Sequence, residues 1–424
     1  MSSTRKAHRG HRRAGVVRAR RSIGQVLSLF AGAGGLDLGL ERAGFGTVAC
    51  LDTDDSAQAV LQANRPTWWV PSNGDVNEAA SWLTPAMVGL KAGELDLIAG
   101  GPPCQPFSKA AQWTSAARVG MRDPRAQSIH GMFSLMDTFL PKALLIENVS
   151  GFLQGRESAI DVVKEHLDDI NKKHGTEYEL TWRIVDAADY GVPQHRQRAI
   201  AIAYRDGASV ELPSPTHAGR PVRAWDALWD LEESDKPSPS GYWTGLLPSI
   251  PEGKNYLHHT ARGDGEEIFG WRTRYWSFLL KLAKDKPAWT IPASPGPSTG
   301  PFHWDNRPLS IREQARLQSF PDSWKFAGID RAQRRLVGNA TPPLLAEVLG
   351  RSIISQLELG EAEMRDRLLT KRPSLLRSRR RSVPTAEEVT PVPDMFREHI
   401  GEKPAHPGHG RGPSPRLVLE EEAV

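Results

Sequence analysis

Cysteine is nearly absent from this chain, which has 424 residues and only two cysteines, Cys50 and Cys104. Two cysteines cannot form a disulfide framework, and alone they cannot supply the four ligands of a cysteine zinc site. Apolar runs near the ~20 residues that span a bilayer are also missing, and the first residues lack the apolar stretch of a secretory signal. These absences predict a soluble, cytoplasmic protein without a membrane partner, and its length allows two or three domains.

Acidic residues are absent from residues 1–22, which carry eight Lys/Arg. Because the whole chain has a formal net charge of +4, the rest of it sums to −4. A second basic cluster lies between Arg365 and Arg381. Basic arms suit contacts with nucleic-acid phosphates. Solvated disordered tails without a specific role, or an organellar transit peptide at the start, are the alternatives.

Internal repeats are absent as well, and short apolar runs alternate with helical patterns along the chain. The runs that we interpret as strands lie at residues 26–30, 47–51, 95–99, 143–146 and 199–203. Helical patterns lie at residues 55–64, 159–172, 310–319 and 343–357. This alternation predicts an α/β fold with a doubly wound, mostly parallel sheet.

Strands are hard to place between residues 206 and 305, where proline, glycine and tryptophan are frequent. We expect a smaller inserted domain there, with most of its tryptophans in a core rather than stacked on a ligand. The predicted order is a basic, disordered arm (1–22), the α/β domain (23–205), the insert (206–305), a return to the α/β domain (306–360) and a charged, disordered tail (361–424).

A glycine-rich turn follows the first strand, where backbone can approach a cofactor closely. Its glycines are Gly32, Gly34 and Gly35. Asp52 ends the second apolar run and could accept hydrogen bonds from ribose hydroxyls, and Asp75 could meet an adenine amino group. Each acid could equally be a helix cap or a turn residue. Their order along the chain favours a nucleoside site.

Cys104 lies just past a predicted strand, in Gly100-Gly101-Pro102-Pro103-Cys104-Gln105-Pro106-Phe107-Ser108. Open α/β sheets hold their ligands at this end of a strand, and the two prolines restrict the backbone. The alternative is a small buried hydrophobic residue, although the polar Gln105 and Ser108 argue against burial. We interpret Cys104 as a candidate nucleophile.

Two further polar positions flank predicted strands. Glu147 ends the run at 143–146 and could act as an acid in a pocket, or simply cap a helix. Arg196 and Arg198 alternate before the strand at 199–203, so both should point to one side. They could bind a phosphate, a cofactor carboxylate or a base oxygen, or form ordinary surface salt bridges.

Taken in order, these segments resemble the bacterial cytosine carbon-5 DNA methyltransferases of restriction-modification systems. The resemblance runs from Val26 to about Leu349 and rests on residues 30–35, 102–105, 147–149, 188–198, 312–321 and 337–343. It implies a Rossmann-like methyltransferase fold that binds S-adenosylmethionine and no metal. The implied cofactor residues are Phe30, Gly32, Gly34, Gly35, Asp52, Asp75 and Asn339. This chain departs from the family at Asp52, often Glu there, and at Thr53, often bulkier.

The resemblance also implies a mechanism and partners. Cys104 would attack carbon 6 of a flipped-out cytosine, Glu147 would share a proton with ring nitrogen 3, Arg198 would lie near the base oxygen, and Arg196 would support the pocket. Residues 206–305 would read base edges of duplex DNA. The residues expected to contact DNA near the reacting base are Gln105, Ser108 and Gln194.

We further expect a monomer, with a cognate restriction endonuclease acting separately if one exists. Two other functions remain open at this point: a transfer-RNA cytosine methyltransferase on the same scaffold, and a catalytically silent, sequence-specific DNA-binding protein. The long insert favours DNA over transfer RNA. The joint presence of Cys104, Glu147 and Arg198 argues against silence.

Overall fold

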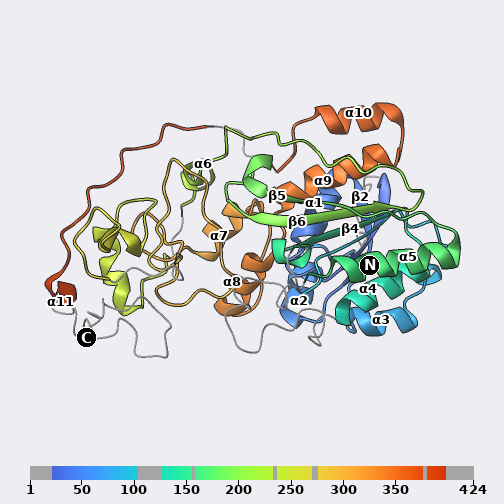
Figure 1. The fold of residues 1–424 in the computed structure, drawn as a ribbon, viewed down its shortest axis with the longest axis horizontal. Coiled ribbons are helices and arrows are strands. Elements are labelled where there is room, and N and C mark those ends of the chain that lie inside the picture. The colour runs from blue at the N-terminus through green and yellow to red at the C-terminus, as the bar shows by residue number, and fades with distance from the viewer. Residues whose placement is uncertain are drawn as a thin grey trace, which may run out of the picture.

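The computed structural model describes residues 22–103, 127–154, 158–232, 236–269, 276–375 and 380–397. A six-stranded sheet of order β2-β1-β3-β4-β6-β5 forms its centre (Figure 1). The strands are β1 (Gly24–Leu29), β2 (Phe45–Leu51), β3 (Leu97–Gly100), β4 (Ala143–Asn148), β5 (Thr181–Asp186) and β6 (Gln197–Tyr204). Neighbours among β2, β1, β3 and β4 are parallel, whereas β6 runs antiparallel to both β4 and β5. The predicted α/β fold with a mostly parallel sheet is confirmed.

Helices cover both faces of the sheet. One face carries α1 (Gly35–Ala43) and α9 (Pro343–Gln356), whose leucines pack with strand residues. The other carries α3 (Val76–Trp82), α4 (Gln127–Phe139) and α5 (Ile160–His174). Strands buried between two helical layers have apolar side chains on both faces, which explains their continuous apolar runs.

The segments that follow the insert in sequence return to the first domain. α2 (Asp55–Asn64) packs against α8 (Asp330–Asn339), and α8 packs against α7 (Ile311–Leu317). α1 and α9 approach so closely at Gly39 that a Cβ added to this residue would lie 2.3 Å from the carbonyl oxygen of Pro343. The glycine therefore permits contact between elements about three hundred residues apart in the chain.

A smaller lobe, residues 224–304, contains α6 (Ala224–Leu228) and 3-10 helices η8 (Tyr242–Ser249) and η9 (Tyr256–His259). In the described residues of this lobe, extended pairing is limited to isolated bridges. The tryptophans divide: Trp243 and Trp304 are buried, whereas Trp229, Trp276 and Trp289 are exposed by 40%, 51% and 37%. The last three are therefore not core residues, contrary to what we expect for most tryptophans of this segment.

Part of the predicted disordered tail is ordered. Residues 362–370 form α10 (Ala362–Thr370), and a strap, residues 380–397, runs to the smaller lobe and ends in α11 (Asp394–Arg397) (Figure 1). Val392 and Phe396 are buried in the core of that lobe, and Thr390 N–H donates to Pro248 O at 3.0 Å. Composition did not predict these contacts, because Val392 and Phe396 are isolated apolar residues among many polar residues and prolines.

Three further 3-10 helices complete the described elements: η1 (Pro85–Val88), η6 (Ser150–Phe152) and η7 (Ala187–Tyr190). η6 follows β4, and η7 joins β5 to the turn before β6. Both therefore lie near the carboxyl end of β4, where the candidate site is found. None of the helices in the described ranges is long and apolar enough to cross a membrane.

Candidate active site

The predicted nucleophile Cys104, with Gln105 and Ser108, lies outside the described residues, but the chain leading to it is described up to Pro103. Asn148 Nδ2, at the end of β4, donates to the carbonyl oxygen of Pro102 at 2.8 Å. A Cβ added to Gly101 would lie 3.0 Å from the carbonyl oxygen of Glu147. The glycine-proline approach to Cys104 is thus held beside Glu147.

Glu147 lies in a buried polar cluster at the carboxyl end of β4. Its Oε1 is 2.9 Å from Arg198 Nε, and its Oε2 accepts a hydrogen bond from Thr341 Oγ1 at 3.0 Å. Because β6 is antiparallel to β4, the amino end of β6 brings Arg198 to this end of β4. The two partners orient the carboxyl group by charge and by hydrogen bonding.

Sequence reasoning did not single out Thr341, which is 194 residues from its partner Glu147. The available signal was its place in the segment Val337–Pro343. A Cβ on Gly35 would lie 2.2 Å from the carbonyl oxygen of Thr341, so the glycine turn and the Thr341 segment are in direct contact.

Arg196 has a different environment from Arg198. Its side chain is 1% exposed, and Nη2 donates to the carbonyl oxygen of Gly338 at 2.8 Å. The resemblance implies that Arg196 supports the pocket. Its burial and its bond to Gly338 connect the turn before β6 with the carboxyl end of α8, which leads to Thr341.

Gln194 corrects another expectation. It is fully buried, and Nε2 donates to Gln318 Oε1 at 3.0 Å while Oε1 accepts from the Ile291 N–H at 2.9 Å. A side chain committed to these interior partners is not placed to contact DNA. Gln194 instead joins the turn before β6 to the end of α7 and to the smaller lobe.

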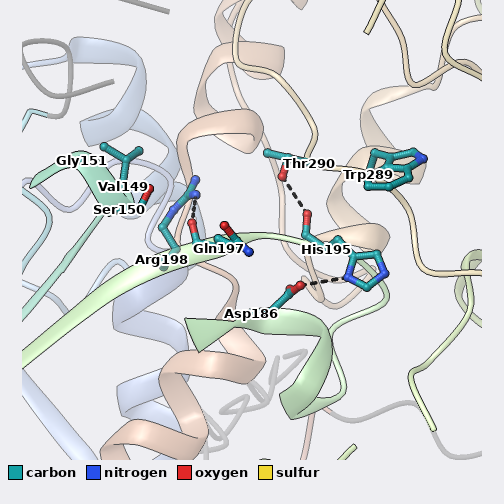
Figure 2. A pocket seen from close by; sticks show the side chains of 9 residues that line it. All are labelled: Val149, Ser150, Gly151, Asp186, His195, Gln197, Arg198, Trp289 and Thr290. Carbon is teal, nitrogen blue, oxygen red and sulfur yellow. Dashed lines mark hydrogen bonds and ion pairs between the residues drawn. The ribbon is translucent and has the colours of Figure 1, made fainter. Parts of the chain in front are cut away.

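A cavity of about 480 Å³ opens beside this cluster (Figure 2). Its lining residues are Val149, Ser150, Gly151, Asp186, His195, Gln197, Arg198, Trp289 and Thr290. His195 Nδ1 is 2.9 Å from Asp186 Oδ2, and Thr290 Oγ1 donates to the His195 carbonyl oxygen at 2.7 Å. The hydrogen bond to Asp186 raises the pKa of His195 above its ordinary value.

A second cavity, of about 300 Å³, lies at the carboxyl ends of β1 and β2. It is lined by Phe30, Asp52, Thr53, Gly74, Asp75, Val76, Asn77, Pro103 and Ser128. Pro103 therefore connects this cavity with the segment leading to Cys104. The sequence-predicted Phe30, Asp52 and Asp75 are brought together here.

Asp52 organises the glycine turn. Its Oδ2 accepts from the Gly32 N–H at 2.7 Å and its Oδ1 from the Asp54 N–H at 2.8 Å, while burial raises its pKa. Asp75 caps α3 through the Asn77 N–H at 2.8 Å, so the helix-cap interpretation of this residue holds while it also lines the cavity.

The remaining predicted cofactor residues lie in different environments. A Cβ added to Gly32 (φ 55°) would make only an ordinary contact, 3.9 Å from the Phe30 carbonyl oxygen, whereas one on Gly34 would lie 2.8 Å from Leu61 and one on Gly35 would meet Thr341. Gly34 and Gly35 are thus required for packing. Asn339, the last residue of α8, is exposed and is not among the residues lining the 300 Å³ cavity.

The other cysteine is unsuited to nucleophilic attack. Cys50 is fully buried at the back of the turn, with Sγ 3.5 Å from Asp37 Oδ1. Burial and the neighbouring carboxyl raise its pKa, which disfavours the reactive thiolate. Burial also raises the pKa of Asp37, to about 6.

Comparisons with known proteins identify the family. The family model described as "C-5 cytosine-specific DNA methylase" matches residues 24–355. Type II methyltransferase M.SacI of Streptomyces achromogenes is 34% identical over 371 residues, covering 78% of this chain and 93% of its own. Type II methyltransferase M.Sau96I of Staphylococcus aureus is 34% identical over 351 residues, covering 78% and 76%.

Among solved structures, the methyltransferase EhMeth of Entamoeba histolytica matches with a TM-score of 0.53 at 16% identity, covering 79% of this chain and 98% of its own. At that identity the likeness concerns the fold alone. The family match, in contrast, extends over most of the chain and includes the ends of β1, β2, β3 and β4. The chain therefore belongs to the C-5 cytosine-specific DNA methylases and is a DNA cytosine-5 methyltransferase.

Proposed function

We propose that this enzyme transfers the methyl group of S-adenosylmethionine to carbon 5 of a flipped-out cytosine in a specific duplex sequence, through a covalent bond to Cys104. The observation that carries the proposal is the cluster of Glu147, Arg198 and Thr341, which lies beside the chain leading to Cys104 and next to the 480 Å³ cavity. We place the cytosine in that cavity. The smaller 300 Å³ cavity, at the glycine turn, suits the cofactor.

The residues of the 300 Å³ cavity fit a nucleoside. Each oxygen of Asp52 accepts one backbone N–H, and each retains acceptor capacity for a ribose hydroxyl. Phe30 offers an aromatic ring and Asp75 a second carboxylate for the base. S-adenosylmethionine supplies an electrophilic methyl carbon when it is bound here.

The chain's own groups prepare the base. The Cys104 thiolate adds to carbon 6, and Glu147 delivers a proton to ring nitrogen 3, so negative charge does not accumulate on the ring. Arg198 holds Glu147 through their ion pair and lines the cavity in which we place the base, so we assign it to the base oxygen. After carbon 5 receives the methyl group, a base removes the proton from carbon 5 and the Cys104 thiolate leaves from carbon 6. Nitrogen 3 returns its proton to Glu147, which restores the neutral aromatic ring.

Thiolate attack requires access to carbon 6, which stacking in duplex DNA prevents. Extruding the base costs a few kcal/mol, which contacts with the protein must offset. We assign sequence reading to residues 206–305 and methylation to a restriction-modification system, because the relatives reported above are Type II methyltransferases. A monomer acting in the cytoplasm, with any endonuclease acting separately, fits this role.

Bisulfite sequencing of DNA from cells expressing the chain tests base, atom and sequence context together. We expect one short context to be methylated at cytosine carbon 5, and Cys104→Ser to abolish the signal. Duplex DNA and transfer RNA are compared as substrates in vitro. Methylation of transfer RNA alone, or unchanged turnover of Cys104→Ser, would refute the proposal.

A further inference from the structure

The side chain of His195 lines the cavity but has no role in the reaction described above. Its ring lines the 480 Å³ cavity, and its side chain is 43% exposed. Nδ1 is bonded to Asp186, whereas Nε2 has no hydrogen-bond partner within the described ranges. Figure 2 shows the ring turned toward Asp186, with Trp289 beyond it.

The contact between His195 and Asp186 is not needed to stabilise the turn between β5 and β6. Asp186 Oδ1 already accepts the backbone N–H groups of Ala188 at 3.1 Å and Arg196 at 2.9 Å, which holds the turn through the main chain. The contact between Asp186 Oδ2 and His195 Nδ1 is separate from these backbone hydrogen bonds, because it uses the other carboxylate oxygen and the imidazole ring. It fixes the direction of an imidazole that lines the cavity and whose side chain is 43% exposed.

We propose that His195, oriented by Asp186, binds the DNA strand by donating a hydrogen bond from Nε2 to a phosphate at the rim of the cavity. The proposal rests on the assignment of this cavity to the flipped cytosine. The flanking phosphates of an extruded nucleotide must pass over the cavity rim, and phosphate contacts hold a protein in register on the duplex. His195 is thus a positioning residue, and it takes no part in proton transfer.

The charges facing His195 favour its cationic form. The carboxylates are Asp186, bonded to the ring, and Asp189 on η7, and both raise the pKa of His195. Arg198 lines the same cavity but is paired with Glu147. Trp289, from the smaller lobe, presents a ring whose centroid is 5.8 Å from that of His195 and carries no charge. Phosphate binding therefore requires the protonated imidazole and weakens as the pH rises through the His195 pKa.

The binding test uses a fluorescent, unmethylated duplex that contains the sequence found to be methylated in cells. A duplex of scrambled sequence is measured beside it. We expect His195→Gln to weaken binding of the target duplex about tenfold, as for loss of a charge-assisted hydrogen bond, and to reduce the salt slope by about one. Because the pKa of His195 is raised above its ordinary value of about 6.5, wild-type affinity should fall as the pH rises past that value. His195→Lys should bind well without that dependence.

A matched control lies between α4 and α5, outside the residues that line the cavity. His174 Nε2 is 2.8 Å from Asp137 Oδ1, in a His–Asp pair between α5 and α4 that does not line the cavity. His174→Gln should leave DNA affinity, its pH dependence and its salt slope unchanged. Thermal unfolding of each variant shows whether an effect is one of folding.

Turnover separates the proposed role from a chemical one. His195→Gln should raise KM for DNA and leave kcat near the wild-type value. A lowered kcat with unchanged KM and Kd, or a Gln variant that binds like the wild type at every pH, would overturn the proposal. If the wild type forms no 5-methylcytosine, the proposed function fails. If the wild type methylates the target but His195→Gln weakens binding to the target and scrambled duplexes equally, the function stands and the phosphate contact at the cavity rim is refuted.

Discussion

Thr341→Val removes one hydroxyl from the buried cluster at the end of β4 while keeping nearly the same volume. The lost contact is the 3.0 Å hydrogen bond from Thr341 Oγ1 to Glu147 Oε2, between two residues that are 8% and 6% exposed. A hydrogen bond to a charged group contributes about 1.5–3 kcal/mol. If all of it serves the orientation of Glu147 in the transition state, kcat should fall about tenfold to a hundredfold.

The assay is single-turnover methyl transfer to duplex DNA at saturating S-adenosylmethionine, which separates chemistry from product release. Thr341→Ser is the matched control because it restores the hydroxyl and should keep most of the rate. KM for DNA should change little, since Thr341 contacts Glu147 and is not among the residues lining the 480 Å³ cavity. Equal rates for the Val, Ser and wild-type enzymes would show that this hydrogen bond does not orient Glu147.

Two further predictions concern stability. Phe396→Ala should lower the free energy of unfolding by about 3–5 kcal/mol, because the strap's phenylalanine is 1% exposed in the core of the smaller lobe. Denaturant titration measures this change, and Arg397→Ala is the control. Exposed ion pairs contribute little to stability, so Arg397→Ala should change the free energy of unfolding only slightly. Equal losses for the two variants would contradict the packing argument. Burial raises the pKa of Asp37 from 3.8 to about 6, so its contribution to stability is present below 3.8 and lost as the pH rises through 6. Asp37→Asn should therefore lose less stability than the wild type between these pH values, and an unchanged pH dependence of unfolding would contradict this.

Local sequence was sufficient for the central strands and several helices. The runs at 95–99 and 143–146 became β3 and β4, because strands buried on both faces have no polar alternation to confuse the pattern. The helix predicted at 55–64 is α2, whose N-cap Asp54 accepts from Ser56 N–H at 2.9 Å. β5 escaped prediction because it lies at the sheet edge, where most of its residues are partly exposed.

The predicted site residues divide in the same way. Phe30, Asp52 and Asp75 line one cavity, as their positions at strand ends implied. Gln194, in contrast, is buried, and no local pattern could show it because its partners lie about a hundred residues or more away in the chain. For Cys104 the sequence and family match remain the basis of the assignment.

By itself, the sequence determined the fold class, the order of the motifs and the residue types that cytosine methylation needs, because strand ends in an open α/β sheet collect ligands at one edge. Only the tertiary structure decided which of these residues meet. Antiparallel β6 brings Arg198 to Glu147, and the return of residues 306–360 brings Thr341 to the same carboxylate. It also decided that the strap packs into the smaller lobe and that His195 faces the cavity rim. These are contacts between segments distant in the chain, which depend on how layers pack and not on local propensity.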